Sequence, residues 1–296
     1  NMSEPEFLVS ILNRHKGWAT IICLIGGGQE INKGESAGIS GWFDTLRSDF
    51  PEWEVFISNK ISDEEYCKGY SFKEITQGIN YKTIDDLHLA VSLRSFRSEN
   101  VSEFVKAVLD VEKDKAKNLY DKFKKDYSIC ITRDLRTAKN WVQEKAKGSQ
   151  RYGITASSGA KRLRKYGVWV QNKIKAPNWF LNGKEDVRSS YFLEETATEF
   201  DIQGLELDWT IVCWDANLRF NNDSFDYYEF KGTKWQKVNN KDNILYLKNA
   251  YRVLLTRARQ GIIIFIPTGN DDDKTMKLEY YDGIYNYLKE IGLEEI

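Results

Sequence analysis

The chain has 296 residues, which predicts about two domains of roughly 100–200 residues each. Hydrophobic residues make up 41% and charged residues 29%, which is the balance of a globular protein with a real core. Lysine and arginine total 43 and aspartate and glutamate 44, so the net charge of -1 excludes a chain-wide basic coat for nucleic acid. A local basic groove remains compatible with it. No apolar run approaches the roughly 20 residues that span a bilayer, so we predict no membrane segment.

The cysteines and histidines argue against a metal site. The four cysteines are far apart and include no C-x-x-C pair: Cys23, Cys67, Cys130 and Cys213. With only His15 and His88 beside them, no zinc ligand set can be assembled at the usual spacings. We predict buried, reduced thiols. Together with an N-terminus that has no basic-then-apolar signal sequence, this predicts a cytoplasmic protein.

In the first third of the chain, apolar spacing predicts helices over residues 6–15 and 38–46. Residues 19–25 are too uniformly apolar for a strand with one buried face, so they predict a strand buried on both faces, as in a parallel sheet covered by helices. That run breaks at three glycines, Gly26 to Gly28. A second strand is predicted over residues 53–57.

From residue 101 onward, predicted strands and helices alternate. Helices are predicted over 101–125, 135–147, 245–257 and 281–291, strands over 128–132, 152–156, 209–214 and 261–266, and loops over 176–190 and 216–244. This alternation predicts an α/β fold with a mainly parallel sheet and helices on both of its faces. The clearest domain boundary lies near residue 98, which gives domains over 1–98 and 99–296.

Three segments have the composition expected of a binding site. In α/β sheets, ligands gather at the carboxyl ends of the strands, and we expect residues 26–30, 198–206 and 251–259 to lie there. The last two are distinctive together. Gln203-Gly204-Leu205-Glu206 leads into a predicted strand, and Tyr251-x-x-x-x-Thr256-Arg257-Ala258 follows later in the chain.

This pair of segments resembles motifs V and VI of superfamily 1 helicases. Upstream, the stretch from Leu93 to Ser98, an aromatic residue followed by Arg-Ser, resembles their motif IV, and Gly26 to Gln29 stands where motif III would stand. The wording of residues 3–8, 24–32, 188–191 and 251–259 is similar to one narrower family, the bacterial Schlafen group 3-like DNA/RNA helicase domain. The resemblance implies an ATP-dependent enzyme with two RecA-like domains that acts on DNA or RNA.

The sequence departs from that pattern in one large respect. It contains no G-x-x-x-x-G-K-[ST] and, before Gly26, no D-E-x-Q. The nearest Gly-Lys pair, Gly183-Lys184, is followed by glutamate. We therefore expect residues 1–98 to be the end of a first RecA-like domain and 99–296 to be the whole second one. ATP and Mg²⁺ are then expected only together with a P-loop segment that these residues lack.

The resemblance assigns catalytic roles to three residues. Arg97 and Arg257 match the arginines of motifs IV and VI, which stabilise the negative charge on the transferring phosphoryl group. Gln29 would position the attacking water or sense the γ-phosphate. This last assignment departs from the wider superfamily, in which an aspartate stands in place of Gly27. The alternative for Arg257 is an ordinary cation that complements the dipole at a helix C-terminus.

The resemblance also implies nucleotide contacts. Phe96 matches the aromatic residue that stacks on adenine, although a core aromatic would look the same. Glu206, in a turn with Gln203 and Gly204, matches the acid that contacts the ribose or couples the site to nucleic acid. A helix N-cap or a surface acid is the alternative for Glu206.

Basic and aromatic residues interleave between 161 and 169. A groove that tracks phosphates and stacks bases needs this mixture, and the candidate nucleic-acid residues are Lys161, Arg162, Arg164 and Trp169. A solvated charge run beside a strand is the alternative of equal weight.

Other function classes remain open. The chain could be a non-catalytic nucleotide- or nucleic-acid-binding regulatory module. Glu229 and Lys231 form an E-x-K, with Asp208 or Asp215 upstream, as in metal-dependent nucleases. Ser158 and Lys161 form the S-x-x-K pair of acyl-transfer enzymes, but without the accompanying S-D-N and K-T-G motifs.

Overall fold

A computed structural model describes residues 2–24, 38–62, 71–87 and 96–296. The chain divides into two compact units, Asn1–Ser92 and Leu93–Ile296. This division falls a few residues before the boundary expected at residue 98. It assigns the whole segment that resembles motif IV to the second unit.

The N-terminal unit is small and mostly helical where it is described. Its elements are α1 (Glu4–Leu12), α2 (Gly38–Asp49), β1 (Val55–Ile57), the 3₁₀ turn η1 (Asn59–Ser62), α4 (Phe72–Thr76), β2 (Tyr81–Thr83) and η2 (Asp85–Leu87). Strands β1 and β2 pair in parallel. A core of Ile39, Phe43, Ile57 and Ile75 joins α2, β1 and α4. The predicted helices at 6–15 and 38–46 and the strand at 53–57 are present with shifted ends.

The predicted buried strand over residues 19–25 is wrong for the residues that the structure describes. Residues 19–24 have no regular structure, and Ile22 and Leu24 are 84% and 81% exposed. A strand buried on both faces needs a paired neighbour and covering helices. In the described part of this unit the strands are β1 and β2, which pair with each other and leave residues 19–24 without a strand to join.

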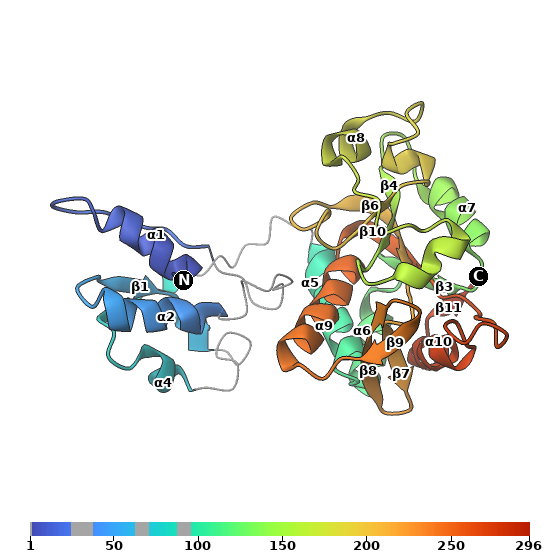
Figure 1. The fold of residues 1–296 in the computed structure, drawn as a ribbon. Coiled ribbons are helices and arrows are strands. Elements are labelled where there is room, and N and C mark those ends of the chain that lie inside the picture. The colour runs from blue at the N-terminus through green and yellow to red at the C-terminus, as the bar shows by residue number, and fades with distance from the viewer. Residues whose placement is uncertain (1, 25–37, 63–70, 88–95) are drawn as a thin grey trace. The chain divides into compact units, whose positions relative to one another are not determined.

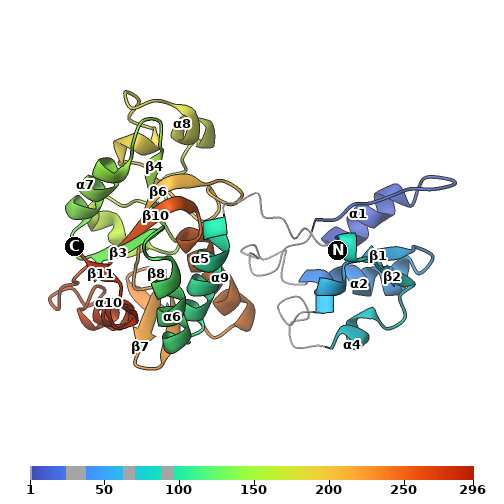
Figure 2. The ribbon, with the colours of Figure 1, turned by 180° about the vertical axis from the view of Figure 1, so that it is seen from behind.

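The C-terminal unit is built on a six-stranded, all-parallel sheet in the order β11-β3-β10-β6-β4-β5. Its strands are β3 (Ser128–Thr132), β4 (Tyr152–Ala156), β5 (Thr196–Ala197), β6 (Leu207–Cys213), β10 (Ala258–Phe265) and β11 (Glu294–Glu295). Its helices and 3₁₀ turns are α5 (Phe96–Leu109), α6 (Lys113–Phe123), α7 (Leu135–Lys145), η3 (Lys161–Tyr166), α8 (Ala176–Leu181), η4 (Ser190–Phe192), α9 (Lys241–Leu255) and α10 (Glu279–Ile291). Figures 1 and 2 show α7 on one side of the sheet and α5, α6 and α9 on the other.

Helices on both faces of the sheet explain why its strands are apolar on both faces. In β10, Ile262 and Ile264 point to one face and Ile263 and Phe265 to the other, and all four are buried. Val142 of α7 belongs to the same core cluster as Ile263 and Phe265. The predicted α/β fold, RecA-like with a mainly parallel sheet covered on both faces, is confirmed.

The single helix predicted over residues 101–125 is wrong. The chain forms two helices, α5 and α6, which pack against each other. Val111, at φ +62°, sits in the left-handed region just past the end of α5. The Glu112 N–H then donates to the carbonyl of Ala107 at 2.8 Å and the Val111 N–H to that of Val108 at 3.2 Å, which is a Schellman helix stop. The reversal brings Phe104 against rings of α6.

The loop predicted over residues 216–244 is also wrong. It holds a three-stranded antiparallel sheet of β7 (Leu218–Asn221), β8 (Ser224–Lys231) and β9 (Lys234–Lys237). Its two tight turns use Asn222 at φ +59° and Gly232 at φ +61°, which are residue types that tolerate this conformation. Within the loop predicted over 176–190, residues 176–181 form α8.

Two further expectations can be compared with the described residues. None of their helices is long and apolar enough to cross a membrane. Cys130 and Cys213 are buried free thiols, as expected, whereas Cys23 is exposed because residues 19–24 do not form a strand. Cys67 lies outside the described residues.

We expect Val111→Gly to stabilise the protein. A left-handed backbone strains a β-branched residue by about 1–2 kcal/mol, and the extra freedom of glycine when unfolded offsets about 0.5–1 kcal/mol of that gain. The thermal midpoint should rise by about 2–4 °C. Lys117→Gly, at an exposed position inside α6, is the control and should lower the midpoint. A loss in Val111→Gly as large as in the control would contradict the strain.

Candidate functional site

Two of the segments singled out above meet at the amino ends of neighbouring strands. Leu207 opens β6 directly opposite Ala258, which opens β10. The Leu207 N–H donates to the carbonyl of Arg257 at 2.9 Å. Nε of Arg259 lies 3.2 Å from Oε2 of Glu206, and these two residues are 53 positions apart in the chain. The matches to motifs V and VI are therefore in contact.

The expectation that these segments lie at the carboxyl edge is wrong for Glu206, Arg257 and Arg259. Strands β6 and β10 are parallel, so residues just before or at the start of each one lie at the amino edge. Of the segment from 198 to 206, only Thr198 and Glu199 follow the carboxyl end of a strand, β5. The loop from 198 to 206 runs from one edge of the sheet to the other because β5 and β6 are parallel to the strand between them.

Arg257 is not a helix residue, which corrects the predicted helix over 245–257. Helix α9 ends at Leu255, and Arg257 lies in the short link to β10. The hydroxyl of Thr256 donates to the carbonyl of Arg252 at 2.8 Å and closes the last turn. The Arg257 side chain is only 1% exposed. A solvated cation at a helix terminus, the alternative explanation for this residue, does not describe a guanidinium so far removed from water.

Gln203 and Gly204 lie in an exposed turn ahead of Glu206. Gly204 takes φ +84°, a backbone conformation that favours glycine. The start of this loop is held by Asp201, whose Oδ2 accepts from the N–H and hydroxyl of Thr198 at 2.8 and 2.7 Å. The turn is thus shaped by local hydrogen bonds and presents Gln203 at the surface.

Phe96 and Arg97 form the start of α5, and their side chains are not described. Helix α5 packs against α9, the helix that leads to Arg257. Gln29 lies outside the described residues.

The basic segment forms the 3₁₀ turn η3, and two of its cations are bound by the protein itself. Nζ of Lys161 donates to the carbonyl of Phe230 at 3.2 Å. Nη2 of Arg162 donates to Oδ2 of Asp273 at 2.9 Å, and its guanidinium lies 5.3 Å from the centre of the Phe230 ring. Lys161 and Arg162 therefore face the β8–β9 hairpin.

Arg164 and Trp169 form a separate exposed stack. The Arg164 guanidinium lies 4.5 Å from the Trp169 ring, which is 44% exposed. Residues 157–184 contain no aspartate or glutamate, although the chain as a whole carries slightly more acidic than basic residues. Of the four candidate nucleic-acid residues, this pair is the more accessible.

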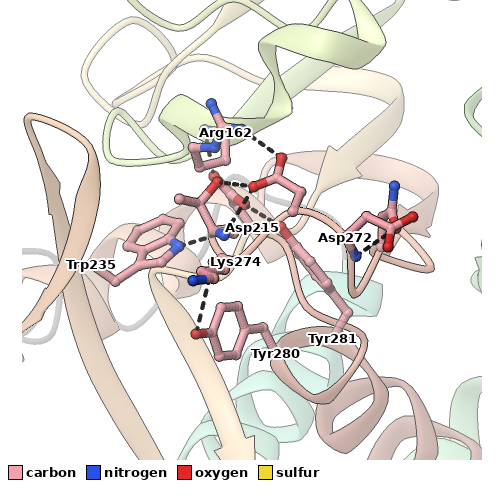
Figure 3. Close-up of polar contacts among 10 residues, drawn as sticks. Arg162, Asp215, Trp235, Asp272, Lys274, Tyr280 and Tyr281 are labelled. Carbon is pink, nitrogen blue, oxygen red and sulfur yellow. Dashed lines mark hydrogen bonds and ion pairs between the residues drawn. The ribbon is translucent and has the colours of Figure 1, made fainter.

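A buried carboxylate, which sequence analysis considered only as a metal ligand, holds the basic turn in place (Figure 3). Asp215 is fully buried just past β6 and accepts from the N–H groups of Arg162 and Ala216 at 3.0 and 2.7 Å and from the Tyr281 hydroxyl at 2.9 Å. Loss of water around the carboxyl raises its pKa, and these donors oppose the rise. Asp215 thus ties η3 to α10.

A second cluster of hydrogen bonds, centred on Arg151, gives a structural role to two of the residues between 188 and 191. Nη1 of Arg151 donates to the hydroxyls of Ser189 and Ser190 at 3.2 and 3.0 Å and to the carbonyl of Trp179. Nη2 donates to the carbonyl of Asn182 at 2.9 Å. These serines fasten the segment that contains α8 to the start of β4. Nothing local in the sequence indicates this, because the partner arginine is more than 30 residues away.

The two other catalytic alternatives find no support in the geometry. Lys231 pairs with Glu229 itself at 2.8 Å, and Asp208 accepts from the Arg151 N–H. Within the described ranges, no group of three His, Cys, Asp or Glu residues could hold a metal ion. The Ser158 hydroxyl donates to Glu199 at 2.7 Å and not to Lys161.

The buried carboxyl of Asp215 should make the stability of the protein depend on pH. A carboxyl with a raised pKa holds its proton more tightly in the folded state, so its stabilising contribution is complete below about pH 4 and is lost as the pH rises through the raised value. We therefore expect the stability of the wild type to fall relative to Asp215→Asn between about pH 4 and pH 8. Urea unfolding across this range measures the difference, with the exposed Asp223→Asn as control. A difference that is constant or rises with pH would show that the carboxyl is ionised throughout.

Comparison with known proteins gives one match. A family model described as Schlafen group 3, DNA/RNA helicase domain, matches residues 1–268. No curated protein matches, and no solved structure matches. The matched range contains Glu206, Arg257 and Arg259 at the amino edge of the sheet, and it contains the basic turn η3. The chain belongs to the Schlafen group 3 DNA/RNA helicase domain family and is a helicase-like domain.

Proposed function

We propose that residues 93–296 act as the second RecA-like domain of a superfamily 1 helicase-like, nucleic-acid-dependent ATPase. The observation that carries the proposal is the contact between the matches to motifs V and VI, Glu206 with Arg259 and Leu207 with Arg257, at the start of two central strands. Residues that serve one nucleotide must lie close together, and these do although they are distant in the sequence.

In this proposal Arg257 and Arg97 are arginine fingers. Phosphoryl transfer spreads negative charge over the γ-phosphate oxygens, and a guanidinium binds such oxygens through a rigid two-pronged fork. Mg²⁺-bound ATP, when held by a P-loop segment, supplies the phosphoryl group. Glu206 would accept from a ribose hydroxyl, Gln203 and Gly204 would shape that side of the pocket, Phe96 would stack on adenine and Gln29 would orient the water.

The residues present fit only part of a nucleotide site. A guanidinium suits a phosphate, and the carboxylate of Glu206, which lies 3.2 Å from Nε of Arg259, suits a ribose hydroxyl. The cradle of backbone N–H groups and the lysine that hold the β- and γ-phosphates are absent from the sequence. The proposal therefore assigns transition-state stabilisation to this chain and assigns ATP binding to a P-loop segment that accompanies it.

The same domain is proposed to contact single-stranded nucleic acid through Arg164 and Trp169. A ring that is half exposed and covered by a guanidinium provides both a stacking surface and a charge for the backbone. If the chain is only a binding module, this surface is its function and Arg257 has no catalytic role.

We expect Arg257→Ala to abolish most ATP turnover in a protein that combines these residues with a P-loop segment. Loss of an arginine finger typically costs about 10³–10⁵ in rate. Arg257→Lys should restore little, because lysine lacks the forked geometry. Steady-state ATP hydrolysis measures the effect, with the exposed Arg136→Ala as control.

Two further measurements make this test decisive. The 296-residue chain alone should hydrolyse ATP at background rate. Since Arg257 is buried, the thermal midpoint of each variant must be recorded, and Arg257→Lys keeps the charge if alanine unfolds the protein. Normal turnover in folded Arg257→Ala would remove the catalytic role and leave the binding module.

For nucleic acid, we expect Trp169→Ala to weaken binding of a single-stranded oligonucleotide by about tenfold, since stacking contributes about 1–3 kcal/mol per base. Arg164→Gln should mainly reduce the salt dependence of binding, by about 0.7 in the log–log slope. Fluorescence anisotropy at several salt concentrations measures both. The exposed Phe192→Ala, on another surface segment, is the control. Unchanged binding in both test variants would place the interface elsewhere.

A further inference from the structure

The β8–β9 hairpin carries an aromatic pair beside the basic turn. Phe230 of β8 and Trp235 of β9 stand opposite each other in register, with ring centroids 5.1 Å apart, and both are partly exposed. The Arg162 guanidinium lies over the Phe230 ring, and Lys161 bonds the carbonyl of the same residue. The basic turn therefore has a stack of rings and cations at each end. Arg164 and Trp169 form one, and Arg162 with the hairpin rings forms the other.

The loop that carries Asp271, Asp272 and Asp273 lies against this second stack. Oδ2 of Asp273 accepts from Nη2 of Arg162, while Oδ1 accepts from the N–H and hydroxyl of Thr275 at 2.9 and 2.6 Å. Nε1 of Trp235 donates to the carbonyl of the same Thr275 at 2.8 Å. In Figure 3 this loop contacts both the Arg162 and the Trp235 side chains. The loop thus fixes one carboxylate oxygen on the guanidinium, next to the exposed edge of the rings.

We propose that the single-stranded nucleic-acid interface continues from Arg164 and Trp169 across Arg162 onto Phe230 and Trp235, and that Asp273 occupies the place of a backbone phosphate in the free protein. A carboxylate and a phosphate offer a guanidinium the same charge-assisted hydrogen bonds. A phosphate of the nucleic acid replaces Asp273 as the partner of the Arg162 guanidinium, and a base stacks on the hairpin rings. This inference rests on the proposed nucleic-acid role.

The exchange is feasible because the ion pair is accessible. The Arg162 and Asp273 side chains are 29% and 32% exposed, so water already competes with this ion pair. Asp273 is held in place by Thr275 whether or not it contacts the arginine. Arg162 is in turn held through its backbone by Asp215, so its position does not depend on Asp273.

A single strand fits this surface better than an acidic protein segment. Two cation–ring stacks at the two ends of one turn give alternating sites for phosphates and bases. A duplex keeps its bases stacked internally and offers no free ring faces. An acidic peptide would use the cations and leave the rings Phe230 and Trp235 without a function.

The test compares Asp273→Asn with Asp272→Asn. Both variants remove one negative charge from the same loop, but only Asp273 contacts Arg162, while Asp272 is its exposed neighbour. Asparagine keeps the oxygen that accepts from Thr275, so the loop should remain folded, which the thermal midpoint checks. Each variant is made in the wild-type and Arg162→Gln backgrounds, and Trp235→Leu reports on the rings.

The probes are deoxythymidine and uridine strands of about 20 nucleotides, longer than one binding site, a DNA duplex of the same length and a glutamate peptide. We expect Asp273→Asn to bind the single strands about threefold more tightly than Asp272→Asn, with a log–log salt slope steeper by about 0.7. In the Arg162→Gln background the two variants should be equal. Trp235→Leu should weaken single-strand binding by roughly tenfold, with little effect on the peptide.

Distinct outcomes separate this inference from the proposed function. If the wild type binds no single strand, the nucleic-acid role falls and this inference falls with it. If it binds, but Asp273→Asn equals Asp272→Asn and Trp235→Leu equals wild type, only the hairpin extension is overturned. Equal tightening for the glutamate peptide and the single strands would overturn the assignment to nucleic acid. If Trp235→Leu is unfolded, the Asp273 and Asp272 pair decides alone.

Discussion

The parallel pairing of β6 with β10 is the constraint on which the rest of the C-terminal unit depends. Both strands are buried on two faces, so neither can shift register without exposing apolar side chains or breaking the ladder between Leu207–Cys213 and Ala258–Phe265. Because the strands run the same way, whatever precedes each of them is brought to one edge. The segments that carry Glu206 and Arg257 therefore meet there, and the ion pair between Glu206 and Arg259 joins them.

The opposite edge is organised by a buried carboxyl group. Asp215 follows β6 directly, and its carboxyl is satisfied by two backbone N–H groups and one tyrosine hydroxyl. One of those N–H groups belongs to Arg162, so the carboxyl fixes the backbone of the basic turn while leaving its guanidinium to act elsewhere. An uncompensated carboxyl at this depth would be strongly destabilising, which makes the turn and the strand interdependent.

The same turn shows how a nearly neutral chain can present a basic surface. Its cations are separated by their partners: Lys161 and Arg162 are held against the β8–β9 hairpin, while Arg164 stacks on Trp169 at the surface. Placing a guanidinium over a ring retains its charge and limits its motion. The proposed nucleic-acid interface depends on this arrangement and not on net charge.

Local sequence pattern was enough for the α/β class, the positions of β3, β4, β6 and β10, and the family, because two-face burial leaves uniformly apolar runs and because the segments at 203–206 and 251–258 are specific. It placed β3 and β4 at their observed residues. Tertiary structure decided what local pattern could not contain. The helix stop at Val111 is accompanied by packing of Phe104 against α6, and residues 19–24 lack a neighbouring strand among the described residues. Glu206 and Arg257 lie at the amino edge because strand direction follows from pairing, and pairing joins residues that no local pattern relates.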